Sequence, residues 1–226
     1  MVVNLFQLFR NFMVIKSQRM KKVLTAIIPV IAIFVVSFTI KSKSAVKNEP
    51  LAIGSELPKA DLKMTDISGK KVSFADAMKE NGLLVMFSCN TCPVVHTYQS
   101  RINEICQYAM ENGFGVILLN PNEAYRDNGD SYEDMKAYAG KEKFGWYYVV
   151  DENSVMADAF GANRTPESFL FNKDKKLVYH GAIDNSRNAG NVTEKYLKNA
   201  IDETKAGKKV SKEFSTSVGC TIKRVK

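Results

Sequence analysis

Two cysteines separated by two residues, Cys89 and Cys92, are the residues of this chain best placed to do chemistry. They follow the apolar run 83–87 and precede a segment with helical periodicity, so a buried strand would end and a helix begin there. The start of a helix carries partial positive charge, which favours a thiolate over a thiol. The second sulfur, one helical turn away, can resolve a mixed disulfide formed by the first. Spacing and context together predict dithiol–disulfide exchange.

A metal or haem site is the alternative use of such a cysteine pair. A structural zinc site needs four ligands, but the chain has no second Cys-x-x-Cys, and His96, His180 and Cys220 are scattered. A c-type haem site needs a histidine directly after the second cysteine, where this chain has Pro93. We therefore expect neither a metal nor an organic cofactor.

The net charge of +8 lies at the two ends of the chain. Residues 1–49 hold eight Lys and Arg against one acidic residue, and residues 205–226 hold seven against one. The part between them is therefore acidic. A basic groove that would bind nucleic acid is not indicated.

Residues 23–40 form an uncharged, apolar run with lysines on both sides. At about 1.5 Å per residue, a helix of this length just crosses the hydrocarbon core of a membrane. The larger number of Lys and Arg before the run favours a cytoplasmic N-terminus. We predict a membrane anchor with the following domain outside the cytoplasm, on the periplasmic or extracytoplasmic side. A signal peptide that is cleaved, giving a secreted protein, is the alternative.

The chain divides into five parts on composition and pattern. They are a cytoplasmic segment (1–22), the anchor or signal segment (23–40), a linker (41–58), a globular domain (59–205) and a basic tail that contains Cys220 (206–226). Within the domain the pattern predicts a hairpin at 62–74, strands at 83–88, 115–120, 146–150, 167–171 and 177–182, and helices at 75–80, 93–112, 131–139, 153–160 and up to about 205. A capping box at Asn191 and Glu194 would open the last helix.

This order of strands and helices resembles the thioredoxin superfamily, and it is most similar to the redoxin (alkyl hydroperoxide reductase/thiol-specific antioxidant-like) branch. The resemblance rests on FSCNTCP at 87–93, RTPE at 164–167 and KDKKLVYHG at 173–181. It implies an α/β, three-layer fold with a central mixed sheet, to which this chain adds an N-terminal hairpin and a transmembrane helix.

The resemblance also implies roles for individual residues. Cys89 would be the nucleophile, more exposed and lower in pKa, and Cys92 the resolving thiol. Thr165 and Pro166 would be joined by a cis peptide bond that faces the cysteines, and both would bind substrate, with backbone at the proline to which a substrate chain can pair.

Two related functions remain as alternatives. A thiol peroxidase of the redoxin family would carry Pro-x-x-x-Thr-x-x-Cys, but counting back from Cys89 gives Met86 and Gly82 in place of Thr and Pro. A copper-binding assembly chaperone would use Cys89, Cys92 and His180 or His96, although such chaperones space their cysteines one residue further apart.

The two other cysteines are expected to differ from each other. Cys106 lies on the apolar stripe of the helix at 93–112 and should be buried and inert. Cys220 lies in a basic tail between Val218 and Ile222, which gives the tail apolar side chains for docking. We predict that the tail folds back and brings Cys220 within reach of Cys89 and Cys92, as an accessory redox residue.

The sequence thus predicts an exported, membrane-tethered thiol–disulfide oxidoreductase. Its partners would be protein or small-molecule disulfides and dithiols, an upstream thiol donor or acceptor, and the membrane, but no nucleic acid.

Overall fold

The computed structural model describes residues 49–225. The predicted membrane segment at 23–40 lies outside these residues. Within residues 49–225, no helix has both the length and the apolar character that a membrane span requires.

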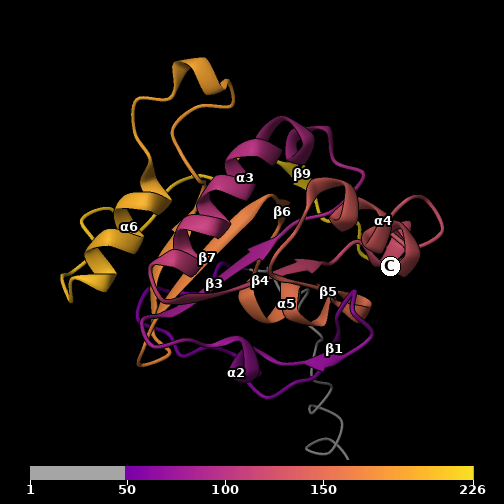
Figure 1. Cartoon of the computed structure of the whole chain (residues 1–226), viewed down its shortest axis with the longest axis horizontal. Helices are drawn as coiled ribbons and strands as arrows, with labels where there is room; N and C mark the ends of the chain where they lie inside the picture. The colour runs from indigo at the N-terminus through magenta and orange to yellow at the C-terminus, as the bar shows by residue number, and fades with distance from the viewer. Residues whose placement is uncertain (1–48, 226) are drawn as a thin grey trace, which may run out of the picture. The chain divides into compact units, whose positions relative to one another are not determined.

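A central mixed sheet, in which β3, β7 and β8 form one hydrogen-bonded set and β4 and β5 another, organises the domain (Figure 1). Strand β7 is antiparallel to β3 and to β8, whereas β4 and β5 are parallel, and β4 lies beside β3. The sheet therefore runs in the order β5, β4, β3, β7, β8. Their bounds are β3 (Gly82–Phe87), β4 (Phe114–Asn120), β5 (Tyr147–Val150), β7 (Glu167–Asn172) and β8 (Leu177–Gly181).

Helices cover both faces of this sheet, as Figure 1 shows. Alternate residues of β3 point to opposite faces: Leu84 packs in the cluster on the side of α3, α4 and α6, and Leu83 in the cluster on the side of α2 and α5. The helices are α2 (Phe74–Ala77), α3 (Pro93–Glu111), α4 (Tyr132–Glu142), α5 (Val155–Phe160) and α6 (Tyr196–Lys205), with short 3-10 turns η1 (Glu123–Tyr125), η2 (Glu152–Ser154) and η3 (Ala189–Asn191). The predicted three-layer α/β fold is confirmed for the described domain.

The N-terminal hairpin is present but short. Strands β1 (Met64–Thr65) and β2 (Lys71–Val72) pair antiparallel across a turn in which Gly69 has a φ of 82°. Residues 51–57, which we assigned to the linker, pack on the domain: the Leu51 backbone N–H donates to the Phe160 carbonyl, and the Leu57 side chain is buried.

The capping box predicted for the last helix is wrong. The helix α6 begins at Tyr196, and Lys195 at its N-cap makes no side-chain hydrogen bond. The Asn185 side-chain oxygen instead accepts from the backbone N–H of Glu194, so Glu194 is tied to an upstream loop. Asn191 belongs to the separate turn η3.

The C-terminal tail is part of the folded domain. Strand β9 (Cys220–Thr221) pairs antiparallel with β6 (Arg164–Thr165), with Thr165 opposite Cys220. Ile222 is buried in the core cluster on the α2 and α5 side of the sheet. The tail therefore reaches the loop that precedes β7.

Candidate functional site

The cysteine motif lies where β3 ends and α3 begins, as the pattern predicted. Cys92 is the N-cap residue of α3, and Pro93 occupies the first helical position, where a missing backbone N–H costs nothing. Cys89 lies in the turn between the two elements and is completely buried.

A buried carboxylate, Asp130, holds the two residues between the cysteines. Its oxygens accept from the Asn90 backbone N–H at 2.7 Å and from the Thr91 hydroxyl at 2.7 Å. They also accept from the side-chain amides of Asn120 at 2.8 Å and Asn122 at 2.9 Å. Four donors satisfy one buried charge, which fixes the conformation of the motif. Sequence reasoning missed Asp130, because it lies 40 residues from Asn90 and no local signal connects it with the motif.

The Thr165-Pro166 bond is cis, as the family resemblance implied. Thr165 touches both sulfurs of the motif: its hydroxyl lies 3.2 Å from Cys89 Sγ, and its carbonyl oxygen lies 3.4 Å from Cys92 Sγ. Glu167, directly after the proline, accepts from the backbone N–H groups of Asn163 and Arg164. These two hydrogen bonds stabilise the conformation of the loop that carries Thr165.

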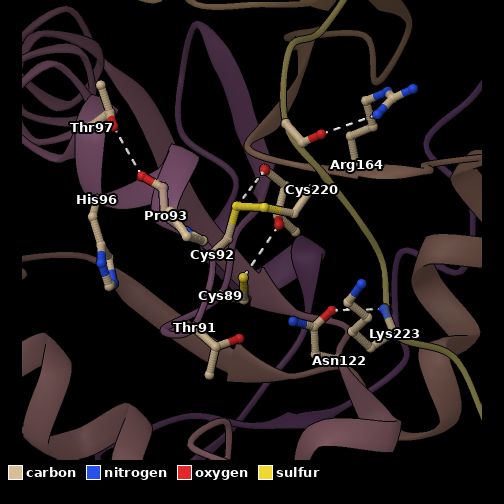
Figure 2. The surroundings of a disulfide bond; sticks show 12 residues. Cys89, Thr91, Cys92, Pro93, His96, Thr97, Asn122, Arg164, Cys220 and Lys223 are labelled. Carbon is tan, nitrogen blue, oxygen red and sulfur yellow. Dashed lines mark hydrogen bonds between the residues drawn. A yellow bond between two sulfur atoms is a disulfide. The ribbon is translucent and has the colours of Figure 1, made fainter.

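Cys92 forms a disulfide with Cys220, 128 residues later in the chain, with the two Cα atoms 6.0 Å apart (Figure 2). Cys89 is a free thiol. The tail thus brings Cys220 to the motif, as we predicted. The bonded pair differs from the Cys89–Cys92 disulfide that an oxidised Cys-x-x-Cys motif would form alone.

Hydrogen bonds hold the tail on both sides of Cys220 (Figure 2). Before it, the Gly219 carbonyl accepts from Arg164 Nη1 at 3.0 Å. After it, the Ile222 backbone N–H donates to the Asn163 carbonyl at 3.1 Å, and the Lys223 backbone N–H donates to Asn122 Oδ1 at 2.9 Å. The position of Cys220 therefore has support besides the disulfide.

The predicted exposure and low pKa of Cys89 are wrong for this disulfide state. Burial raises the pKa of the Cys89 thiol above its ordinary value, and the charge of Asp130 adds to this effect. The Thr165 hydroxyl acts in the opposite direction but does not outweigh burial. Cys92 is itself the N-cap residue of the helix that we expected to favour the thiolate, whereas Cys89 lies three residues before it, outside the helix.

The two histidines are engaged by other groups. His96 Nε2 lies 2.6 Å from the Asn90 carbonyl oxygen. His180 Nε2 lies 2.7 Å from Glu167 Oε1, and its ring stacks on Phe169. Within residues 49–225, His, Cys, Asp and Glu side chains form no cluster of three or more suited to a metal. The copper-chaperone alternative therefore gains no support from the geometry.

Cys106 is buried in α3, as predicted. Burial raises the pKa of its thiol. It packs in the core on the side of α3 and α6 and forms no disulfide.

The sequence of this chain is similar to those of known proteins. Residues 53–180 match the model of the AhpC/TSA family. The chain is 26% identical over 143 residues to "Thiol-disulfide oxidoreductase ResA" of Bacillus thuringiensis (strain Al Hakam), covering 63% of this chain and 77% of that protein.

Two solved structures are similar over most of the chain. An uncharacterized conserved protein from Geobacillus kaustophilus has a TM-score of 0.72 and 30% identity, and the match covers 77% of this chain and 93% of that one. A hypothetical protein from Sinorhizobium meliloti 1021 has a TM-score of 0.71 and 29% identity, covering 78% of this chain and 97% of that one. The family model spans more than half of the chain, and the chain belongs to the AhpC/TSA family, in the redoxin branch of the thioredoxin-like superfamily.

Proposed function

We propose that this thiol–disulfide oxidoreductase works outside the cytoplasm, tethered to a membrane, and that Cys89, Cys92 and Cys220 carry its exchange reaction. The observation that carries the proposal is the meeting of three cysteines at one residue, Thr165. Its side chain contacts Cys89, its carbonyl contacts Cys92, and its backbone pairs with Cys220. The related proteins named thiol–disulfide oxidoreductase support the same activity.

Cys92 is the sulfur shared by two alternative disulfides. In the disulfide state described here it is bonded to Cys220. The Cys89 thiolate can attack Cys92 Sγ, forming Cys89–Cys92 and releasing Cys220 as a thiolate, which takes up the proton that Cys89 loses. The exchange conserves electrons and needs no cofactor. A disulfide or dithiol substrate and an upstream thiol donor or acceptor complete the cycle.

Export and tethering rest on the apolar run at 23–40 and its flanking charges. A disulfide in the resting fold suits an oxidising compartment outside the cytoplasm. Secretion after cleavage of that run is the alternative. Fractionation of cells, with a membrane-impermeant amine reagent applied to intact cells, separates the two: the exposed lysines of a tethered domain are labelled in the membrane fraction, and those of a cleaved one in the medium or periplasm.

Reduction of insulin disulfides by dithiothreitol is the test of activity. We expect the full chain to accelerate this reaction and Cys92→Ser to abolish the acceleration, because Cys92 belongs to both disulfides. Cys106→Ser is the matched control and should keep the wild-type rate. A wild-type protein no faster than dithiothreitol alone would remove the proposal. Hydrogen peroxide should oxidise the protein slowly, since the Thr and Pro of the peroxidase motif are absent.

A further inference from the structure

The three sulfurs of the site differ in access to solvent. Cys89 has no exposed surface, and Cys92 is 3% exposed. Cys220 is partly exposed. An external sulfur must approach along the axis of the disulfide it attacks, so access decides which cysteine can react first.

The backbone edge that a substrate chain would use is already occupied. Residue Thr165 pairs with Cys220, and Arg164 pairs with Thr221. At Gly219 the tail comes so close to the segment of Thr165 that an added Cβ atom would lie 2.3 Å from the Thr165 carbonyl oxygen. An extended substrate therefore cannot pair with Thr165 while the tail is docked.

The tail is also anchored independently of the disulfide. Upstream, the Ser215 hydroxyl accepts from the Ala182 backbone N–H at 2.9 Å and lies 2.6 Å from the Tyr179 hydroxyl. Downstream, Ile222 is 4% exposed, and Lys223 is held by Asn122. These contacts do not involve the disulfide, so we expect Cys220 to stay beside Cys92 after reduction.

We propose that Cys220 is the cysteine through which the enzyme exchanges disulfides with its protein substrates, and that Cys89 receives a disulfide by internal transfer through Cys92. This inference rests on the proposed function, and it moves first contact with the substrate from Cys89 to Cys220. It makes the tail a fixed part of the catalytic site.

The external step balances as a pair of thiol–disulfide exchanges. A substrate thiolate attacks Cys220 Sγ, the Cys92–Cys220 bond breaks, and Cys92 leaves as a thiolate. A second substrate thiolate then attacks the substrate sulfur of the mixed disulfide and releases Cys220. The substrate dithiol has become a disulfide, and Cys92 and Cys220 are reduced. The reverse sequence reduces a substrate disulfide.

The test uses the full chain carrying Cys89→Ser, which keeps the Cys92–Cys220 disulfide and blocks internal transfer. Reduced glutathione is the probe; the reaction is quenched with acid, free thiols are alkylated, and the adducts are mapped by peptide mass spectrometry. We expect glutathione on Cys220 and the alkyl group on Cys92, in a ratio of about ten to one or more, because exposure governs attack.

Each other outcome is decisive. Glutathione on Cys92 with alkylated Cys220 would overturn the assignment while leaving exchange activity intact. No adduct at either cysteine, with the disulfide surviving, would overturn both the assignment and the proposed function. In a second measurement, Cys220→Ser should slow insulin reduction by about tenfold or more, with Cys106→Ser as control; a wild-type rate for Cys220→Ser would also overturn the assignment.

Discussion

Asn122 accepts a hydrogen bond from the backbone N–H of Lys223 at 2.9 Å. The same side chain donates through Nδ2 to Asp130 at 2.9 Å. Asp130 in turn holds the backbone of Asn90 and the hydroxyl of Thr91, the residues between the motif cysteines. One buried amide therefore connects the loop of the cysteine motif with the tail that carries Cys220.

Asn122→Ala should loosen the tail and weaken the Cys92–Cys220 disulfide. The substitution leaves the Lys223 N–H without its partner and Asp130 with one donor fewer, at a cost of about 1–3 kcal/mol. In a series of glutathione buffers, half of the Cys92–Cys220 disulfide should be reduced at a ratio of squared reduced glutathione to oxidised glutathione that is about tenfold lower than for wild type. Asn128→Ala, at an exposed position of the same loop, is the control. Identical titrations for Asn122→Ala and wild type would show that this hydrogen bond does not hold the tail.

Gly219→Ala should displace the tail from Thr165. The added Cβ would meet the Thr165 carbonyl oxygen at 2.3 Å, and relief of such an overlap costs about 1–3 kcal/mol. We expect a higher yield of Cys92 alkylation under mild reduction. Gly140→Ala, in α4 with nothing within 4 Å of the added atom, is the matched control and should be neutral or slightly stabilising. Equal alkylation in the two variants would contradict the close packing at Gly219.

Alkylation of Cys89 in the disulfide-bonded protein should be slow at neutral pH and should rise steeply above it. Burial raises the pKa of this thiol, so the thiolate fraction stays small until the pH exceeds the ordinary range of a cysteine. Rates of iodoacetamide modification, followed by mass spectrometry between pH 6 and pH 10, measure this. A plateau reached by pH 7 would contradict the raised pKa. Cys106 serves as an internal reference and should react only after unfolding.

Asp151 should make the domain less stable as the pH rises from about 4 to about 6. Burial raises the pKa of its carboxyl from 3.8 to about 6, although it accepts from the backbone N–H groups of Met156 and Ala157. In that pH range the folded state holds a proton that the unfolded state has lost. The free energy of unfolding therefore falls by about 1 kcal/mol per pH unit from this group. The stabilisation that Asp151 contributes is complete at pH values below the pKa of its carboxyl in the unfolded state.

Urea denaturation at several pH values tests the Asp151 prediction. Asp151→Asn should flatten the slope between pH 4 and pH 6. Glu152→Gln, at an exposed neighbouring position, should leave the slope as in wild type. An unchanged slope in Asp151→Asn would assign the pH dependence to other groups.

Local pattern predicted most of the fold, because periodicity and caps are short-range signals. The strand before Cys89 and the helix after Cys92 both follow from neighbouring residues. The cis bond at Thr165-Pro166 followed from family resemblance.

Long-range contacts explain what the sequence did not reveal. Asp130 lies 40 residues from Asn90, so no local pattern indicates that it supports the motif. The burial of Cys89 depends on tertiary packing, which reversed the pKa expected from its place near a helix start. The position of the tail was predictable only in outline, from the apolar residues around Cys220.

Disulfide mapping of the wild-type full chain across a series of glutathione buffers is the most direct test of the three-cysteine mechanism. We expect Cys92 to enter a disulfide with Cys220, a Cys89–Cys92 disulfide to appear alongside it, and Cys106 to stay reduced throughout. A Cys92 that remains a free thiol at every glutathione ratio would contradict the proposed three-cysteine mechanism.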